Sequence, residues 1–241
     1  MRLRAAAYRN YVLLRRRLLG LPAPGRTRWG DLRSVEPVGR EFGTDRGGPI
    51  DRRYIEGFLG QNSADVRGRV LELGDDAYTV RFGGDRVTSK EILYVKAGNP
   101  QATIVADLAD APQIPDDSFD CVILTQALHL IYEARAALRT LHRILRPGGV
   151  LLLTVPGITP VPTRSVWGYT WHWAFTALST ERMLRESFPA GTVAVQSYGN
   201  VLAATAFLQG LAQEELATQE LDAVDPDFPV IIAARAQKGA S

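Results

Sequence analysis

Apolar residues along the chain fall into two patterns, short continuous runs and longer segments with helical spacing. The short runs are rich in β-branched residues and Leu, which is typical of buried strands. The run at 119–125 is apolar on both faces, as a central parallel strand requires. The pattern predicts strands at 69–73, 91–95, 102–107, 119–125, 150–156, about 192–198 and 230–235.

Helices are expected between several of these strands. From 134 to 145, Ala, Leu and Ile recur on one stripe, and "PGG" at 147–149 ends the helix. Further helices are expected at 51–60 and at about 200–216. The alternation of strands and helices predicts an α/β fold, a doubly wound, Rossmann-like sheet with helices on both faces.

The first 50 residues differ from the rest of the chain. Residues 3–19 carry Ala and Leu at helix-like spacing, and "GLPAPG" at 20–25 ends this helix. Residues 26–50 are rich in Gly, Arg and Pro and are expected to form an irregular arm. We therefore expect a basic N-terminal helix and arm at 1–50, followed by a domain at 51–241.

Charge is unevenly placed along the 241 residues, although the formal net charge is only +2. The first 33 residues contain nine Arg and one acid, Asp31. A basic arm can bind nucleic acid or an anionic membrane surface. Arg is the usual base throughout this chain, so we do not expect nucleic-acid binding, and we expect at most weak membrane contact of the N-terminal helix.

The single cysteine and the hydropathy of the chain limit the compartment and the class of protein to be expected. Cys121 has no partner for an internal disulfide, which fits a reducing compartment. The sequence has neither an apolar stretch of transmembrane length nor a signal peptide, since Arg15 to Arg17 interrupt the first apolar segment. We therefore expect a cytoplasmic protein. Its three His and one Cys show no metal-ligand spacing, so no metal is expected.

Candidate binding residues follow the strands, because ligands of open α/β sheets lie outside the carboxyl ends of the strands. Gly74 would allow a ligand to approach the backbone closely. Asp107 would accept a hydrogen bond from an adenine or amine N–H, or it would cap the turn after its strand. The segments in question are 72–78, 95–99, 107–108 and 125–129.

Three blocks of sequence together resemble a known family. They are "VLELG" (70–74), "ADLADAPQIPDDSFDCVILTQALHLI" (106–131) and "ALRTLHRILRPGGVLLLTVP" (137–156). They resemble class I S-adenosylmethionine-dependent methyltransferases, and most of all the broad type 11-like group that accompanies glycosyltransferases. The resemblance covers about 66–156, which would be the cofactor half, and leaves about 157–241 as the acceptor half.

The resemblance implies S-adenosylmethionine as the cofactor and assigns roles to residues. Glu72 and Gly74 would meet its amino acid end, Asp107 and Leu108 its adenine, and Thr125 and Gln126 its methionine side. The ring of Tyr78 would cover the cofactor. The full implied set is Glu72, Gly74, Asp75, Tyr78, Asp107, Leu108, Thr125 and Gln126.

Two features depart from the family pattern. The loop after the first strand has Asp75 to Thr79 where the family has further glycines. The second strand ends in "LYVKAGNP", without the acid that usually binds the ribose hydroxyls. Asn99 or Asp75 would have to replace that acid.

Histidine is suited to take a proton from an acceptor hydroxyl. His129 follows the fourth strand, and His172 lies in the aromatic segment "VWGYTWHW" at 166–173, so both are candidate bases, although either would also suit simple packing. The arm at 41–54 precedes the first strand, where the family often has a lid, and Asp45, Arg46, Asp51 or Tyr54 would reach the site from it.

These observations predict an enzyme that transfers a methyl group to a small-molecule or glycan acceptor, at a hydroxyl oxygen. One alternative is a binding module that keeps the fold without catalysis. A nicotinamide-dependent oxidoreductase is the other alternative, but "ELGDDAYTV" lacks the G-x-G-x-x-G turn that it would need.

Deletion of residues 1–24 tests whether the basic helix takes part in cofactor binding. We expect the affinity for S-adenosylmethionine to stay unchanged, because the predicted binding residues begin at Glu72. Titration calorimetry on the full and shortened chains measures this. A large loss of affinity in the shortened chain would place the helix at the site.

Overall fold

The computed structural model describes residues 11, 14–15, 18–22, 27–163 and 170–240. It consists of two compact units, Met1–Val38 and Gly39–Ser241, and the second contains the sheet. Most of the helix expected at 3–19 lies outside the described residues. The domain boundary expected near residue 50 stays a prediction.

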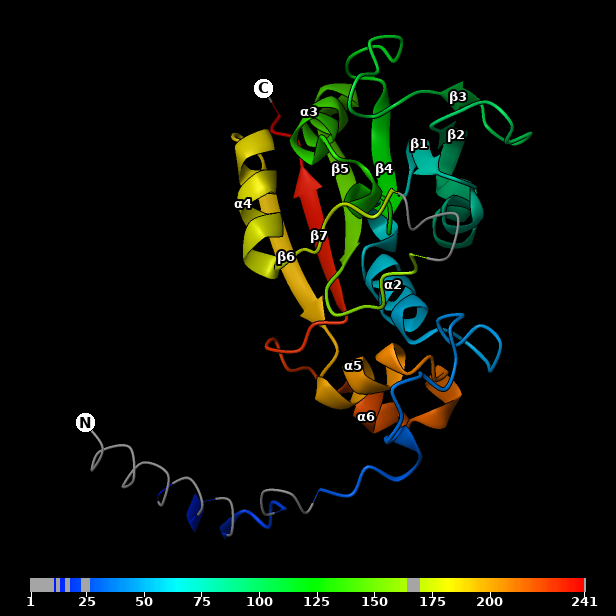
Figure 1. Ribbon diagram of the computed structural model, residues 1–241. Helices are drawn as coiled ribbons and strands as arrows, with labels where there is room; N and C mark the ends of the chain where they lie inside the picture. The colour runs from blue at the N-terminus through cyan, green and yellow to red at the C-terminus, as the bar shows by residue number, and fades with distance from the viewer. Residues whose placement is uncertain (1–10, 12–13, 16–17, 23–26, 164–169, 241) are drawn as a thin grey trace. The chain divides into compact units, whose positions relative to one another are not determined.

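The described part of the second unit forms one seven-stranded sheet with the order β3-β2-β1-β4-β5-β7-β6 (Figure 1). Neighbouring strands from β3 to β5 run parallel, and β7 pairs antiparallel with both β5 and β6. The strands are β1 (Gly68–Leu73), β2 (Val87–Tyr94), β3 (Ile104–Val105), β4 (Phe119–Thr125), β5 (Leu145–Pro156), β6 (Thr192–Tyr198) and β7 (Ile231–Gln237).

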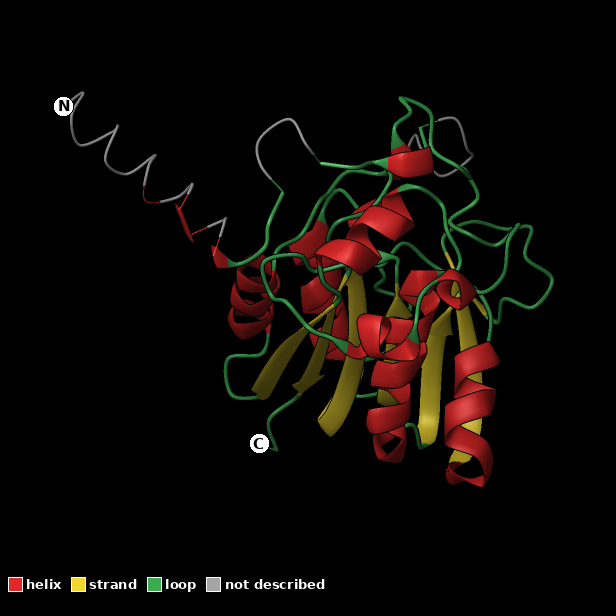
Figure 2. Ribbon diagram, turned by 90° about the horizontal axis from the view of Figure 1, so that it is seen from below, coloured by secondary structure: helices red, strands yellow, loops and turns green. Residues whose placement is uncertain are grey.

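Helices cover both faces of this sheet, as the sequence predicts, and Figure 2 shows them against the strands. One apolar core lies under α3 and α4, and the other lies under α2 and α5. The α-helices are α2 (Ile50–Gln61), α3 (Ala134–Ile144), α4 (Ala177–Ser187), α5 (Val201–Leu208) and α6 (Thr218–Asp222). Short 3₁₀ or π turns occupy Gly30–Leu32, Ser63–Asp65, Thr79–Gly83, Gly84–Arg86, Leu128–Leu130 and Gln213–Glu215.

Local side-chain chemistry begins two of these helices. The Thr176 hydroxyl accepts the N–H of Ser179 at the start of α4, and the Ser179 hydroxyl accepts the N–H of Thr176. The Asn200 side chain accepts two N–H groups in the first turn of α5. Such caps satisfy amide groups that have no partner within the helix.

Several elements differ in length from the sequence prediction, and β2 begins at Val87, four residues before the expected start. The helix expected to run to residue 216 ends at Leu208, because Gly210 adopts a φ of +71° and closes the last turn. The strand expected at 102–107 is reduced to Ile104–Val105, and Asp107 already belongs to a turn. The fifth strand starts five residues earlier than expected, at Leu145.

The connections around β2 are short in this fold. Residues 74–86 join β1 to β2 through the π and 3₁₀ turns, and residues 95–103 join β2 to β3 without a helix. The carboxyl end of β1 therefore meets a short helical turn at 77–83, and the carboxyl end of β2 meets a loop.

The arm before α2 packs against the segment between β6 and β7. The Gly39 N–H donates to the Gln209 carbonyl, Arg46 pairs with Glu215, and the Gly48 N–H donates to Glu214. Figure 1 shows α5 and α6 beyond the end of β6, beside this arm. These contacts bring the arm to the edge where β1 and β4 end.

Gly68→Ala tests the register at the start of β1. Gly68 has a φ of +66°, and an added Cβ would lie 2.2 Å from Asp120 Oδ2, which accepts the Arg69 N–H. We expect destabilisation of about 1–3 kcal/mol from backbone strain and from the displaced Asp120.

Gly57→Ala is the matched control, since an added Cβ there meets nothing within 4 Å on the exposed side of α2. It should stabilise the protein by about 0.5–1 kcal/mol, because Ala has the higher helix propensity. Urea unfolding measures both changes, and equal effects of the two substitutions would contradict the role of Gly68.

Candidate functional site

Glu72 organises the loop after β1. Its side chain is 2% exposed, and its two oxygens accept the N–H groups of Tyr78 (3.2 Å) and Thr79 (2.7 Å). Burial raises the pKa of Glu72 to about 7, against the opposing effect of these hydrogen bonds. Both carboxylate oxygens therefore hold the loop, and the predicted contact of Glu72 with the cofactor ammonium stays a prediction.

Gly74 lies at the open point of the same loop. It adopts a φ of +90°, and a Cβ built there would meet nothing within 4 Å. Its N–H donates to the Leu93 carbonyl, and its own carbonyl accepts the Asn99 side chain at 2.7 Å. The backbone is thus held between the ends of β1 and β2 and leaves space on one side for a ligand.

The structure does not single out a residue that would replace the missing acid at the ribose. The Asn99 amide donates to Gly74, and its oxygen accepts the Gln101 N–H. Asp75 is exposed, and its Oδ1 accepts the Ala77 N–H in a local turn. Both candidates for the missing acid therefore also serve the loop itself.

The two residues predicted to meet the adenine differ in how deeply they are buried. Asp107 is exposed just after β3, and its Oδ1 accepts the Ala109 N–H. Leu108 is 2% exposed and belongs to the apolar core on the α3 and α4 face. Asp107 faces solvent at the sheet edge, whereas Leu108 would support an adenine ring only from beneath.

Thr125 and Gln126 end β4, and the backbone at Gln126 is strained. Gln126 has a φ of +48°, which is uncommon for a residue other than Gly. Its N–H donates to the Thr154 carbonyl, and its Nε2 donates to the Thr154 hydroxyl at 3.2 Å. These bonds leave the Gln126 amide oxygen available for another donor.

His129 lies in the Leu128–Leu130 turn and is 2% exposed. Its Nδ1 has no hydrogen-bond partner, and desolvation lowers the pKa of His129 to about 4. The Trp171 ring packs against it at 4.2 Å between centroids. This histidine is therefore neutral at physiological pH and keeps one buried nitrogen unsatisfied.

A cavity of about 220 Å³ adjoins His129. It is lined from both sides, by the arm and the start of α2 and by the segments that follow β4 and β5. The lining residues are Phe42, Asp51, Gln126, His129, Leu130, Thr159, Pro162 and Trp171.

The aromatic segment divides between this cavity and the surface. Trp171 lines the cavity, whereas Trp173 is 40% exposed and its indole N–H donates to the Ile131 and Tyr132 carbonyls. His172 is exposed, with its ring 5.4 Å from that of Tyr132. Trp167 and Tyr169 lie outside the described residues. The structure therefore brings His129 and Trp171 together and leaves His172 outside the cavity.

Only some of the polar arm residues that were predicted to reach the site lie at the cavity. Asp51 lines the cavity, and its Oδ1 accepts the Arg52 N–H. Arg46 is paired with Glu215, and the Tyr54 hydroxyl donates to the Leu221 carbonyl. Phe42, which the sequence does not single out, also lines the cavity. Its φ of +56° is a property of the folded backbone that no local pattern reveals.

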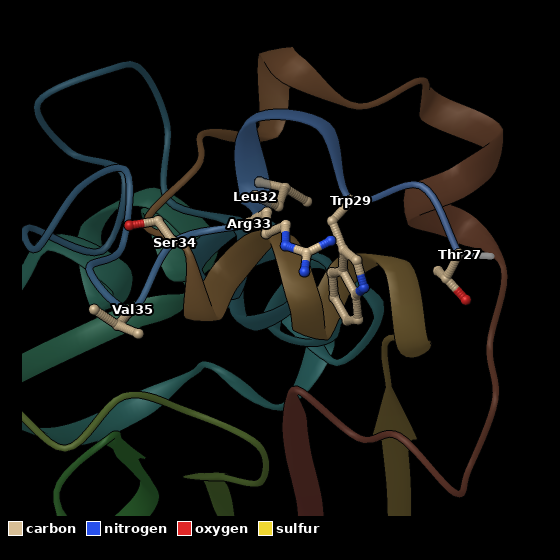
Figure 3. A pocket seen from close by; sticks show the side chains of 6 residues that line it. All are labelled: Thr27, Trp29, Leu32, Arg33, Ser34 and Val35. Atoms are coloured by element: carbon tan, nitrogen blue, oxygen red, sulfur yellow. The ribbon is translucent and has the colours of Figure 1, made fainter. Parts of the chain in front are cut away.

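A second cavity, of about 550 Å³, lies in the N-terminal unit. Figure 3 shows its six lining side chains, all of which come from Thr27 to Val35. None of them follows a strand, so this cavity has no counterpart among the predicted site residues.

The described residues contain no group of three or more His, Cys, Asp or Glu side chains that could hold a metal ion. Nor does any helix in the described part combine the length and the apolar character needed to span a membrane.

Comparison with known proteins supports the predicted similarity to methyltransferases. Residues 74–153 match the family described as a methyltransferase domain. The ubiquinone/menaquinone biosynthesis C-methyltransferase UbiE of Pectobacterium carotovorum is 31% identical over 90 residues, which are 36% of this chain and 32% of UbiE. UbiE of Hydrogenovibrio crunogenus is 35% identical over 86 residues, with the same coverage. The match thus spans about a third of each of these relatives.

Solved structures share the fold. An S-adenosylmethionine-dependent methyltransferase from Mesorhizobium loti has a TM-score of 0.52 at 18% identity, covering 79% of this chain and 99% of its own. This chain therefore has the fold of class I methyltransferases. The [4+2]-cyclase SpnF has a TM-score of 0.54 at 17% identity, covering 86% of this chain and 88% of its own. Because a protein named as a cyclase has the same fold, the domain fold by itself does not decide the reaction.

The titration of Glu72 predicts how the stability of the domain depends on pH. The native pKa, about 7, lies above the ordinary value of 4.5, so the native state binds more protons than the unfolded state in between. This contribution to stability is fully present below pH 4.5 and is lost as the pH rises through 7. It amounts to about 3 kcal/mol.

Glu72→Gln removes this titration while keeping one acceptor oxygen. Urea unfolding of both proteins is measured at pH 5 and pH 8. The free energy of unfolding of the parent, taken relative to that of the variant, should be lower at pH 8 than at pH 5 by most of that amount. A difference that does not change with pH would contradict the buried, raised carboxylate.

Proposed function

We propose that this protein transfers a methyl group from S-adenosylmethionine to an acceptor bound at the carboxyl edge of its sheet. The observation that carries the proposal is the match of residues 74–153 to a methyltransferase domain on a sheet of this strand order. When bound, the cofactor supplies an electrophilic methyl group, and its sulfur keeps the electron pair of the bond that breaks.

Three features of the edge fit this cofactor. Gly74 leaves open space beside the backbone where β1 ends. Asp107 presents an exposed carboxylate where β3 ends, suited to an adenine amino group. Gln126 holds a strained backbone where β4 ends, and strain of this kind concentrates at functional sites.

One feature supports the rival proposal of a binding module without catalysis. The end of β2 carries no acid for the ribose, and the Asn99 amide donates to the Gly74 carbonyl. Both proposals place a ligand at the same edge, so they differ in whether S-adenosylmethionine binds. Absence of heat on titration with S-adenosylmethionine would favour a module for another ligand.

For the acceptor we propose a small molecule or glycan methylated at a hydroxyl oxygen. The cavity beside His129 supports this, because it combines aromatic walls with separate polar groups. Titration calorimetry with S-adenosylmethionine, followed by mass spectrometry for products heavier by one methyl group in metabolite and glycan pools, tests the proposal.

Asp107→Asn separates a cofactor role from a structural one. Asn can still accept the Ala109 N–H and keep the turn, but its amide nitrogen cannot accept from an adenine amino group. We expect the affinity for S-adenosylmethionine to fall by about tenfold or more, the usual effect of losing a hydrogen bond to a charged group, with an unchanged melting temperature.

Asp110→Asn, an exposed carboxylate in the same turn, is the matched control and should bind like the parent. If Asp107→Asn lowers the melting temperature and leaves affinity intact, Asp107 serves the turn alone.

A further inference from the structure

The cavity of about 220 Å³ has features that the cofactor roles do not use. Its volume corresponds to about seven waters, which is smaller than the usual pocket for a whole drug-sized ligand. A ring-sized part of a molecule would fill it. The cavity is therefore suited to one ring of the acceptor rather than to the adenosyl cofactor.

Backbone strain gathers at this cavity. In the described part of the chain, three residues other than Gly have a positive φ, namely Phe42, Asp117 and Gln126. Two of them, Phe42 and Gln126, line the cavity, and they come from segments far apart in the sequence. Bulky residues adopt this conformation only where the surrounding structure imposes it, and such positions cluster at ligand sites.

Hydrogen-bond acceptors dominate the polar lining. The Gln126 Nε2 already donates to Thr154, which leaves its amide oxygen. His129 is 2% exposed, and its Nδ1 is enclosed and has no partner. Asp51 supplies a carboxylate whose Oδ1 accepts a single backbone N–H, that of Arg52. A ligand that donates hydrogen bonds would satisfy the Gln126 and Asp51 oxygens.

The charges of the described lining residues disfavour one class of acceptor. Among these residues Asp51 is the only ionisable acid, and none is Lys or Arg. A phosphate or carboxylate would meet the Asp51 charge without a compensating cation from the described lining, which is unfavourable in a partly desolvated site. A single ammonium group would pair with the carboxylate but would leave the Gln126 amide oxygen unsatisfied.

We propose that this cavity binds a neutral, polyhydroxylated ring of the acceptor, such as one sugar residue, and that Asp51 accepts the proton of the hydroxyl that is methylated. This deepens the proposed function and rests on it. The methyl group replaces the proton on the acceptor oxygen, the proton goes to the Asp51 carboxylate, and the electron pair of the broken carbon–sulfur bond stays on sulfur. Neutral His129 lies in the cavity wall and packs beside the ring.

The electrostatics favour Asp51 over the histidines as the base. Burial raises the pKa of Asp51 to about 6, against the opposing effect of Arg52, so the carboxylate is a stronger base than usual and is ionised at pH 7. Desolvation makes His129 a weaker base than usual. The Tyr78 hydroxyl also lies in this charged surrounding: burial raises the pKa of Tyr78, Arg52 opposes this, and Glu56, Asp51 and Glu72 add to it.

Binding in the absence of cofactor tests the substrate class separately from the proposed function. Three ring-sized probes, the methyl α-glycosides of glucose, mannose and rhamnose, are compared by ligand-observed NMR with cyclohexylammonium and cyclohexanecarboxylate. We expect at least one glycoside to bind and neither charged ring to compete with it. Asp51→Asn should weaken glycoside binding by about tenfold, as for a lost charged hydrogen bond.

Asp45→Asn is the matched control, an exposed acid in the same arm that does not line the cavity. It should bind like the parent. The substrate class is overturned if no glycoside binds, if cyclohexylammonium binds in preference, or if Asp51→Asn binds as well as the parent. Calorimetry with S-adenosylmethionine alone on the same samples shows whether the proposed function stands in each case.

Transfer of label from methyl-labelled S-adenosylmethionine to the bound glycoside tests the role of Asp51 as base. In the parent, the rate should fall about tenfold per pH unit below pH 6, as Asp51 becomes protonated. Asp51→Asn should lose this inflection and lower the rate by about 10²- to 10⁴-fold, the usual range for a general base, with cofactor affinity unchanged. An inflection that persists in Asp51→Asn would assign the base elsewhere.

Discussion

The buried carboxylate of Glu72 is the interaction on which the cofactor edge depends. The loop after β1 has no further glycine between Gly74 and Gly83, and its turn is held by the Glu72 oxygens, which accept the N–H groups of Tyr78 and Thr79. A buried carboxylate is costly unless it is hydrogen-bonded, so the loop and the side chain stabilise each other. This arrangement leaves Gly74 as the point where a ligand can approach the backbone.

A side-chain hydrogen bond also holds the short connections around β2. Asn99 bonds the Gly74 carbonyl, so the end of the second strand closes onto the end of the first. The end of β2 carries no acid, and the Asn99 amide holds the two loops together. The cavity beside His129 lies on the β4 and β5 side of this edge.

The arm before α2 forms part of this β4 and β5 side of the edge. The arm is fixed to the segment between β6 and β7 by the Arg46–Glu215 ion pair and by backbone bonds of Gly39 and Gly48. Once it is fixed there, Phe42 and Asp51 face the residues that follow β4. The cavity thus depends on contacts between segments more than 160 residues apart in the sequence, such as Arg46 with Glu215.

The sequence by itself determined the sheet, because strand runs and the amphipathic stripe of α3 are local patterns that report burial directly. It also indicated His129 and Gln126 as residues at the end of β4. It did not reveal the end of the α5 helix, where Gly210 adopts a positive φ inside a segment that was expected to stay helical to about residue 216. Only the tertiary structure decided that His172 is exposed and does not line the cavity beside His129. It also decided that the Glu72 oxygens accept N–H groups of their own loop, and that Phe42 and Asp51 complete the cavity wall. The physical reason is that orientation, desolvation and backbone strain arise from contacts between distant segments, which no local pattern encodes.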